Sequence, residues 1–408
     1  MIGRTFGVLR NPRFARFYLA QAASQLGDAI SWVALALLAV QLEGAERAPV
    51  VVALALTLRV GAYVVLGPFA GVVADRVDRR LLLTGCHLGR AATIGLMFAV
   101  TEAWHVYVLI LVTNAFTAFF TPANQATVPL VAGRGQVRSA FALSAATTEV
   151  FGIIGPGLAG LLALTTGARA LFLVVAGAFL LAGLLSWTLG PLRVPPHADS
   201  VATTQWADVR DGTTRLWGDA PIRFALLMEL VAAISGALVL TVTVGRVQHG
   251  LNLSEAHFGW AMAAYGLGAT VASLAVGQLV RVPLVRWIAI GAALTTLAVL
   301  PADISPYGTL LALWAVAGVG QNWVNLPAET LIAERTEQAA QGRVYGAHFA
   351  WSHLWWLLSY PLAAVLTDRF PDHTFLVGSL VGAVILVVVA LAHVATLRRG
   401  RSLAVARS

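Results

Sequence analysis

The sequence Gly71-Val-Val-Ala-Asp75-Arg76-Val-Asp78-Arg79-Arg80 sets a cluster of charged side chains between two long apolar stretches. The apolar stretch before the cluster covers residues 50–73, and the one after it covers residues 81–100. A helix needs about 20 apolar residues to cross the hydrocarbon core of a bilayer, and both stretches reach that length. A charged turn between two such stretches is typical of a short loop at one face of a membrane.

The composition of the whole chain agrees with this interpretation. Of 408 residues, 58% are hydrophobic and 11% are charged, whereas soluble domains carry about 25% charged residues. We therefore predict an all-α membrane protein with twelve transmembrane helices. The expected spans are residues 15–40, 50–73, 81–100, 104–120, 140–164, 170–189, 224–247, 258–280, 287–301, 309–326, 347–367 and 375–396.

The arginines predict how the chain is oriented. The chain has no lysine, and 21 of its 27 arginines lie in the two termini, counting Arg16 at the edge of the first span, and in the loops after even-numbered spans. Cytoplasmic loops carry an excess of basic residues. We therefore expect a multi-pass protein of the cytoplasmic membrane with both termini in the cytoplasm. The net charge of +8 reflects this topology, so no nucleic-acid partner is expected.

The polar stretch 190–223 is the longest interruption between spans, and it predicts three parts. Residues 1–189 would form one six-helix bundle, 190–223 a cytoplasmic linker with an amphipathic helix on the surface, and 224–408 a second bundle. Pro122-Ala123 and Pro327-Ala328 are 205 residues apart, as are Arg138 and Arg343. This shared offset favours two pseudo-symmetric halves, which is the plan of many transporters.

Residues 71–80 resemble the signature loop between spans two and three of the major facilitator superfamily, usually written G-x-L-A-D-R-x-G-R-R. Val73 replaces the Leu, and Asp78 replaces the second Gly. Residues 119–126, 139–144 and 155–160 are similar to the branch of twelve-span drug:proton antiporters, which includes macrolide, tetracycline and enterobactin exporters. The resemblance implies the major facilitator fold and a monomeric secondary transporter in the lipid bilayer.

The same resemblance implies export of small amphipathic compounds or drugs, including antibiotics, in exchange for protons by alternating access. A lysolipid or glycolipid flippase on this fold is the main alternative, and a membrane enzyme or sensor is a third. No catalytic residues, metal site or cofactor are expected, and the proton gradient would supply the energy. The absence of lysine also excludes a P-loop for ATP.

The charged loop has a structural task that its residues can perform. Gly71 would let a neighbouring helix approach closely, and the carboxylate of Asp75 could cap a facing helix N-terminus and pair with an arginine. The family resemblance implies that Gly71, Asp75, Arg76 and Arg80 form a cytoplasmic gating motif. The alternative is a solvated loop whose arginines only set the topology.

Charged side chains within membrane spans are costly and usually functional. Asp28 and Arg59 lie at similar depths, so we hypothesise that they form an ion pair, with Arg90 as the alternative partner of Asp28. Asp28 would then be either a structural element or a proton carrier. Glu149 and Glu229 are further proton-coupling candidates, because a carboxyl group that is removed from water protonates more readily. Glu229 could instead extend to water at the nearby interface.

Further candidates lie on other spans. Gly155, Pro156 and Gly160 resemble the antiporter motif of span five, although glycines here could serve close packing alone. A mostly apolar cavity with a few polar groups suits amphipathic molecules, whereas Trp and Tyr also line bilayer interfaces. The candidates for lining a substrate cavity are Gln21, Gln25, Asn114, Asn322, Trp323, Trp351 and Trp355.

Overall fold

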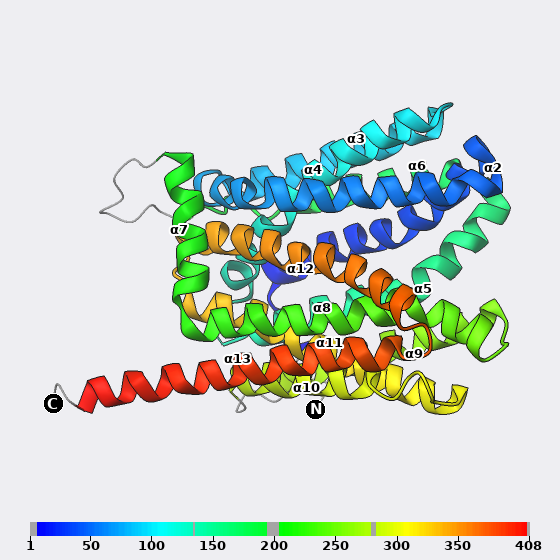
Figure 1. The fold of residues 1–408 in the computed structure, drawn as a ribbon. Coiled ribbons are helices and arrows are strands. Elements are labelled where there is room, and N and C mark those ends of the chain that lie inside the picture. The colour runs from blue at the N-terminus through cyan, green and yellow to red at the C-terminus, as the bar shows by residue number, and fades with distance from the viewer. Residues whose placement is uncertain (1–5, 134, 194–203, 279–282, 406–408) are drawn as a thin grey trace. The chain divides into compact units, whose positions relative to one another are not determined.

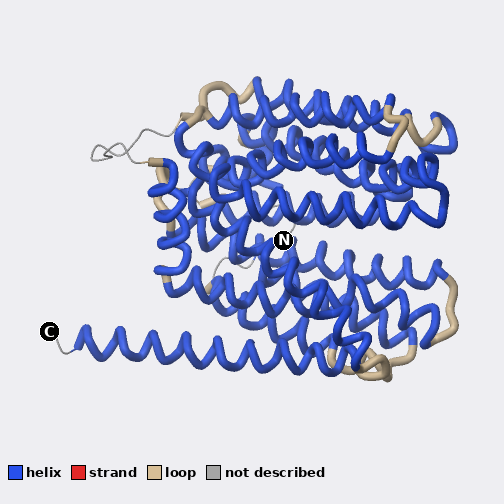
Figure 2. The backbone as a smooth tube through the Cα atoms, turned by 45° about the horizontal axis from the view of Figure 1, so that its top comes forward, coloured by secondary structure: helices blue, strands red, loops and turns tan. Residues whose placement is uncertain are grey.

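The computed structural model describes residues 6–133, 135–193, 204–278 and 283–405, and within these ranges it contains helices and loops but no strand (Figure 2). The elements of the first part of the chain are η1 (Gly7–Arg10), α2 (Pro12–Arg76), α3 (Arg79–Leu96), η2 (Met97–Ala99), α4 (Ala103–Ala132), α5 (Val137–Thr166), α6 (Ala170–Trp187) and α7 (Gln205–Gly218). Those of the second part are α8 (Ala220–Gly245), η3 (Arg246–Gly250), α9 (Glu255–Gln278), α10 (Leu284–Val299), α11 (Tyr307–Arg335), α12 (Gln341–Arg369) and α13 (Thr374–Val405).

The element α2 consists of two membrane-spanning helices that meet at a break at Gly44. It begins after Asn11, whose side chain accepts hydrogen bonds from the backbone N–H groups of Arg13 (3.0 Å) and Phe14 (3.4 Å). Such capping satisfies N–H groups that have no partner within the helix. At Gly44 the backbone turns out of the helical conformation, with a φ of 75° that glycine adopts readily. The kink separates the candidate spans Pro12–Gly44 and Val51–Arg76.

Each of the twelve expected spans coincides largely with a helix, since α2 carries two of them and α3–α6 and α8–α13 carry one each. The expected spans 81–100, 170–189, 224–247 and 287–301 run two to four residues past the end of the α-helix, and residues 279 and 280 of the span 258–280 lie outside the described part of the chain. Within the described residues, nine helices are long and apolar enough to cross a membrane. The helix α10 is shorter, and α11 and α12 do not belong to that set. Polar side chains near their centres, including Gln321, Asn322 and His353, lower the hydropathy of α11 and α12.

The chain divides into two compact units. Unit 1 comprises Met1–Thr213 and Ala333–His353, so it combines the elements from η1 to α6 with part of α7, the end of α11 and the beginning of α12. Within it, α2 packs against α4, α5 and α6, and α3 packs against α4 and α6 (Figure 1). Its main buried cluster includes Leu35, Leu38, Met97, Phe172 and Phe179.

Unit 2 comprises Thr214–Ile332 and Leu354–Ser408. Within it, α8, α10 and α13 pack against one another. Its buried cluster includes Leu238, Val299, Leu310, Trp314 and Phe375. The carboxylate of Asp303 accepts hydrogen bonds from the backbone N–H groups of Phe375 (3.3 Å) and Leu376 (2.8 Å) at the start of α13, so it acts as a helix cap supplied by a distant loop.

The predicted linker, residues 190–223, contains α7, while residues 194–203 lie outside the described part of the chain. Figure 1 shows α7 running crosswise to α2. Its exposed Trp206 packs edge-on against Phe69 of α2, with ring centroids 5.1 Å apart. Asp208 and Gly212, which are one turn apart, are buried. The first half of α7 therefore packs on protein, whereas the sequence suggested a helix lying on the membrane surface.

Candidate functional site

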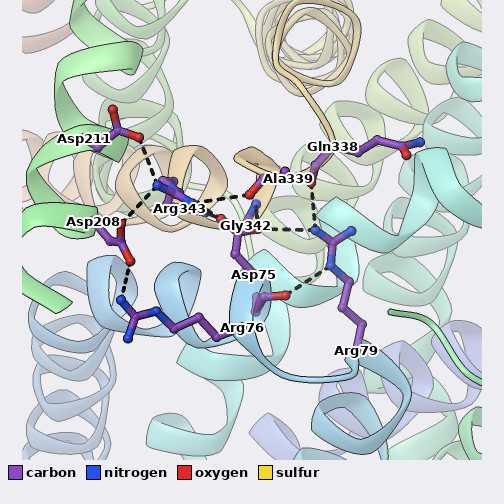
Figure 3. Close-up of polar contacts among 10 residues, drawn as sticks. Asp75, Arg76, Arg79, Asp208, Asp211, Gln338, Ala339, Gly342 and Arg343 are labelled. Atoms are coloured by element: carbon purple, nitrogen blue, oxygen red, sulfur yellow. Dashed lines mark hydrogen bonds and ion pairs between the residues drawn. The ribbon is translucent and has the colours of Figure 1, made fainter. Parts of the chain in front are cut away.

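Asp75 lies at the end of α2 and caps the N-terminus of α12 (Figure 3). Its carboxylate accepts hydrogen bonds from the backbone N–H groups of Gly342 (2.7 Å) and Arg343 (2.9 Å). These N–H groups are among those that a helix leaves without internal partners, and the N-terminus carries a partial positive charge. The Asp75 side chain is 3% exposed. This contact ties the end of span two to the start of span eleven.

Arg343 is shared by three carboxylates. Its Nε lies 3.2 Å from Asp75, and its Nη1 lies 3.1 Å from both Asp208 and Asp211 of α7. Asp208 also pairs with Arg76 of α2 at 2.6 Å. We call Asp75, Arg76, Arg79, Asp208, Asp211, Gly342 and Arg343 the Asp75 network. It brings together α2, α3, α7 and α12 (Figure 3).

Arg79 takes the place in this network that the sequence assigned to Arg80. Its side chain is 1% exposed, and it donates to the carbonyl oxygens of Ala74 (3.2 Å) and Ala126 (2.6 Å) and to Asp75 (3.3 Å). Arg80 instead lies over the ring of Trp187, 4.4 Å from its centroid. One residue corresponds to about 100° around a helix, so adjacent arginines of α3 point in different directions.

Glycines bring α2 and α12 into backbone contact. A Cβ atom at Gly71 would lie 2.4 Å from the carbonyl oxygen of Gly342 and 2.8 Å from the Cα of Gly346. A Cβ atom at Gly346 would lie 2.5 Å from the carbonyl oxygen of Gly67. Any larger side chain at these positions would push the two helices apart, so the glycines set the separation at which Asp75 reaches the end of α12.

A cavity of about 310 Å³ lies among the spans of unit 1. Asp28 lies near the middle of the span Pro12–Gly44, and Arg59 lies in the span Val51–Arg76. We call this cavity the Asp28 cavity. It is lined by Gln25, Asp28, Ala29, Ser31, Trp32, Leu35, Arg59, Tyr63, Ile94, Ile110, Thr113, Asn114, Thr117, Thr148, Gly152, Phe172 and Phe179.

Asp28 forms its ion pair with Arg90 of α3, so the hypothesised pair with Arg59 is wrong and its alternative is correct. The Asp28 side chain is 48% exposed, whereas that of Arg90 is 1% exposed. Arg90 also donates to Ser24 Oγ at 3.0 Å and lies over the ring of Phe179, 4.0 Å from its centroid. Similar depth in the membrane does not decide pairing, because the direction of each side chain around its helix decides it as well.

Arg59 contacts aromatic rings in the same cavity. Its Nε donates to the hydroxyl of Tyr63 (3.1 Å), which in turn donates to Asn114 Oδ1 (2.9 Å). The ring of Tyr63 also packs against Phe349 and His353 of α12, with centroid distances of 4.9 and 4.8 Å. Tyr63 therefore contacts both the cavity and the helix that Asp75 caps.

The remaining polar candidates of unit 1 take different places. Gln25 and Asn114 line the Asp28 cavity. Gln21 is buried and accepts a hydrogen bond from Ser144 Oγ at 2.7 Å, so it joins α2 to α5. Glu149 is half-buried on α5 and is not among the residues that line the cavity.

The glycines of span five serve different purposes. A Cβ atom at Gly155 would lie 2.5 Å from the Cβ of Ala29, so Gly155 allows α5 to approach α2 closely. Gly160 has open space where a Cβ would stand, and Pro156 lies inside the continuous helix. Gly152 lines the Asp28 cavity. Close packing thus accounts for Gly155 but not for Gly160.

The candidates of unit 2 are mostly packed within it. Glu229 is buried on α8, and Asn322 is buried on α11. Trp323 Nε1 donates to the carbonyl oxygen of Ala272 (3.3 Å), and Trp355 Nε1 donates to that of Leu226 (3.0 Å). Trp351, on the part of α12 that belongs to unit 1, is half-buried. Trp323 and Trp355 therefore fasten neighbouring helices through hydrogen bonds to the backbone.

Comparison with known protein families decides the identity of the fold. The family model described as Major Facilitator Superfamily matches residues 17–246 and again residues 225–405. The chain belongs to the Major Facilitator Superfamily. The predicted all-α membrane fold of this superfamily is confirmed, and the chain is a multi-pass membrane transporter and not an enzyme.

Relatives within the superfamily include transporters named for drug efflux. The chain is 26% identical over 395 residues to the multidrug efflux pump Tap of Mycolicibacterium fortuitum, covering 91% of this chain and 93% of Tap. It is 28% identical over 195 residues to macrolide efflux protein A of Streptococcus pyogenes, which covers 46% of each chain. It is also 26% identical over 361 residues to the MFS-type transporter YfiS of Bacillus subtilis, covering 83% of each chain.

A solved transporter structure shares the fold. The crystal structure of the human organic anion transporter MFSD10 (TETRAN) superposes with a TM-score of 0.71, covering 93% of this chain and 99% of that chain, at 17% sequence identity. Sequence identity this low supports a common fold alone.

Several residues of the Asp75 network were not among those predicted from the superfamily motif. Asp208 and Asp211 lie in a segment that the sequence assigned to a linker, and Arg343 was singled out only as the counterpart of Arg138. Arg138 forms its own ion pair with Glu334 of α11 at 2.8 Å. The spacing of Asp208 and Asp211, three residues apart and hence on one helix face, could have indicated a shared cationic partner.

Proposed function

We propose that this transporter exports small amphipathic compounds, in exchange for protons, by alternating access. The observation that carries the proposal is the Asp28 cavity, in which a half-exposed carboxylate lies among apolar walls. Mostly apolar cavities with a few polar groups suit amphipathic molecules. Efflux as the direction is supported by the names of the relatives Tap and macrolide efflux protein A.

Asp28 is the proton-coupling residue that this proposal favours. Its carboxylate is open to the cavity, while Arg90 holds it from the buried side. Protonation of Asp28 would release Arg90 from its charge partner and leave a buried cation, which is unfavourable. Asp28 would therefore take up a proton only in a conformation in which Arg90 has moved to another partner. Such a dependence of protonation on conformation is what proton coupling requires. Glu149 and Glu229 remain further candidates.

The Asp75 network would act as the cytoplasmic gate. Its polar bonds join α2 to the N-terminus of α12, and they would have to break for the cytoplasmic side to open. Tyr63 packs against Phe349 and His353 of the same α12. A compound that displaces Tyr63 would therefore also disturb the packing of α12, the helix that the Asp75 network joins to α2.

Transport by purified protein in liposomes tests the proposal. A panel of a macrolide, a tetracycline, ethidium and the small carboxylate dansyl-glycine is offered under an imposed pH gradient, and proton flux is followed with a pH-sensitive dye. We expect uptake that needs the gradient. We expect Asp75→Asn to slow this uptake by about tenfold, because the lost hydrogen bonds to a charged group, about 1.5–3 kcal/mol each, stabilise the state with a closed cytoplasmic side, which every transport cycle must populate. Asp372→Asn, which alters an exposed carboxylate in the turn after α12, should transport as the wild type does.

Two outcomes would contradict parts of this proposal. If no compound moved and no proton gradient collapsed, the exporter proposal would fail as a whole. If Asp75→Asn transported at the wild-type rate, the network would have no part in gating. Coupling is examined separately with Asp28→Asn, for which uptake that still depends fully on the gradient would eliminate Asp28 as the proton carrier.

A further inference from the structure

Arg59 presents an unused hydrogen-bonding face to the Asp28 cavity. Its guanidinium carbon lies 4.7 Å from the ring centroid of Trp32 and 5.4 Å from that of Tyr63. Only its Nε donates to a described residue, the hydroxyl of Tyr63. Across the described part of the chain, no carboxylate pairs with Arg59. The N–H groups on Nη1 and Nη2 are thus available to a ligand.

The charges around the cavity leave an excess of one positive charge. Asp28 and Arg59 are the charged residues among those that line it. The charge of Asp28 is already balanced by Arg90, which is buried behind it and also donates to Ser24. The charge of Arg59 has no such balance among the described residues. A second anion in the cavity would therefore be attracted to Arg59.

The surroundings of Arg59 prepare it for a planar, two-point contact. A guanidinium group matches a carboxylate or phosphate through two parallel hydrogen bonds. The aromatic contacts with Trp32 and Tyr63 and the hydrogen bond from Nε limit the directions in which the group can point. A charged side chain within a membrane span is costly and is usually retained for function.

We propose that the Asp28 cavity binds amphipathic organic anions, with Arg59 paired to the anionic group and the apolar walls holding the rest of the molecule. This inference rests on the proposed function and narrows its substrate class. The apolar part would lie against Leu35, Ile94, Ile110, Phe172 and Phe179. The volume of about 310 Å³ is at the lower end of ligand pockets, so the anion is small.

A cationic ligand fits these residues less well. It would have to approach Asp28, but that carboxylate is engaged by Arg90, and it would meet the positive charge of Arg59 in the same cavity. Like charges that share a site of low polarity repel strongly. Among compounds that share one aromatic group, we therefore expect the anion to bind most tightly, the neutral ester less tightly and the cation most weakly.

Binding of three dansyl compounds to the full-length protein in nanodiscs tests this order. Dansyl-glycine carries a carboxylate, its methyl ester is neutral, and dansylcadaverine carries an ammonium group, so head-group charge is the main difference. Fluorescence anisotropy reports binding without requiring transport. We expect dansyl-glycine to bind about tenfold more tightly than its ester, because only the carboxylate can form a charge-assisted pair with Arg59.

Three variants assign the preference to Arg59. Arg59→Gln should weaken binding of dansyl-glycine by about tenfold and change binding of the ester by less than about twofold. Arg59→Lys should retain part of the preference, since it keeps the charge but loses the planar fork. Arg369→Gln removes an exposed arginine at the end of α12 and should bind all three compounds as the wild type does.

Competition identifies the source of the anion. Displacement of dansyl-glycine by 2-naphthoate would support a small carboxylate, and displacement by lysophosphatidate would support a lipid; either result supports the anion site. Displacement by neither, equal affinity of wild type for all three dansyl compounds, or a preference for dansylcadaverine would overturn it. The wild-type comparison decides even if Arg59→Gln does not fold. If the anion site were overturned in this way, transport of cationic or neutral compounds in liposomes would still support the exporter proposal.

Discussion

At the scale of single residues, Asp28 and Arg90 form a pair whose two members are unequally protected from solvent. Arg90 is buried, whereas Asp28 is half-exposed to the cavity. Removing Asp28 leaves a buried, unpaired cation, which is strongly destabilising. Removing both members and filling the space with an apolar side chain is often neutral.

We therefore expect Asp28→Ala to lower the free energy of unfolding by about 3 kcal/mol, the lower end of the range for a broken buried pair. The double variant Asp28→Ala, Arg90→Met should recover at least half of that loss. Thermal unfolding in detergent measures both. A double variant no more stable than the single one would mean that Arg90 is held mainly by Ser24 and the ring of Phe179.

Some side-chain contacts of these residues could be predicted from the sequence, and others could not. The capping role of Asp75 could be predicted, because a carboxylate at a membrane face next to a helix N-terminus has few other partners. The sequence could not predict that Arg79 and not Arg80 contacts Asp75. Nor could it predict that Asp28 pairs with Arg90 and not with Arg59. Depth along a span follows from residue number, but the direction around the helix depends on packing with helices distant in sequence.

At the scale of elements, the contact between α2 and α12 depends on glycines from both helices. Gly71→Ala would place a Cβ atom 2.4 Å from the carbonyl oxygen of Gly342. We expect it to lower the free energy of unfolding by about 1–3 kcal/mol, as overpacking does, and to weaken the hold of Asp75 on α12. Thermal unfolding and the liposome assay measure the two effects.

Gly61→Ala is a matched control on the same helix, because a Cβ atom there would meet nothing within 4 Å. Alanine is favoured over glycine inside helices by about 0.5–1 kcal/mol, so this control should be neutral or slightly stabilised. Equal effects of the two substitutions would show that the position of Gly71 against Gly342 is unimportant.

Most elements could be predicted from hydropathy, since the membrane requires long apolar helices. The docking of α7 could not. Its acids Asp208 and Asp211 resemble a solvated face in sequence, and their partner Arg343 lies more than 130 residues further along the chain. The pairing depends on where α12 begins, which no local pattern specifies.

At the scale of the whole molecule, the arginine distribution predicts that both termini lie in the cytoplasm. Alkaline phosphatase is active only outside the cytoplasm. Fused to the C-terminus, it should therefore be inactive, whereas a green fluorescent protein at the same place should fluoresce. Fused after Ala168, in the short turn between α5 and α6, alkaline phosphatase should be active. The reverse pattern would invert the topology and assign the Asp75 network to the outer face.

The glycine contact between α2 and α12 has a kinetic consequence. At Gly67, Gly71 and Gly346 the two helices meet backbone to backbone, and the ring of Tyr63 packs against Phe349 and His353 next to this contact. Along these glycines the helices can separate without a change of side-chain rotamers. The activation barrier to separation should then come mainly from the polar bonds of Asp75 and Arg343 at one end of the contact and from the ring packing of Tyr63 at the other. The two helices should therefore separate rapidly once these contacts are broken.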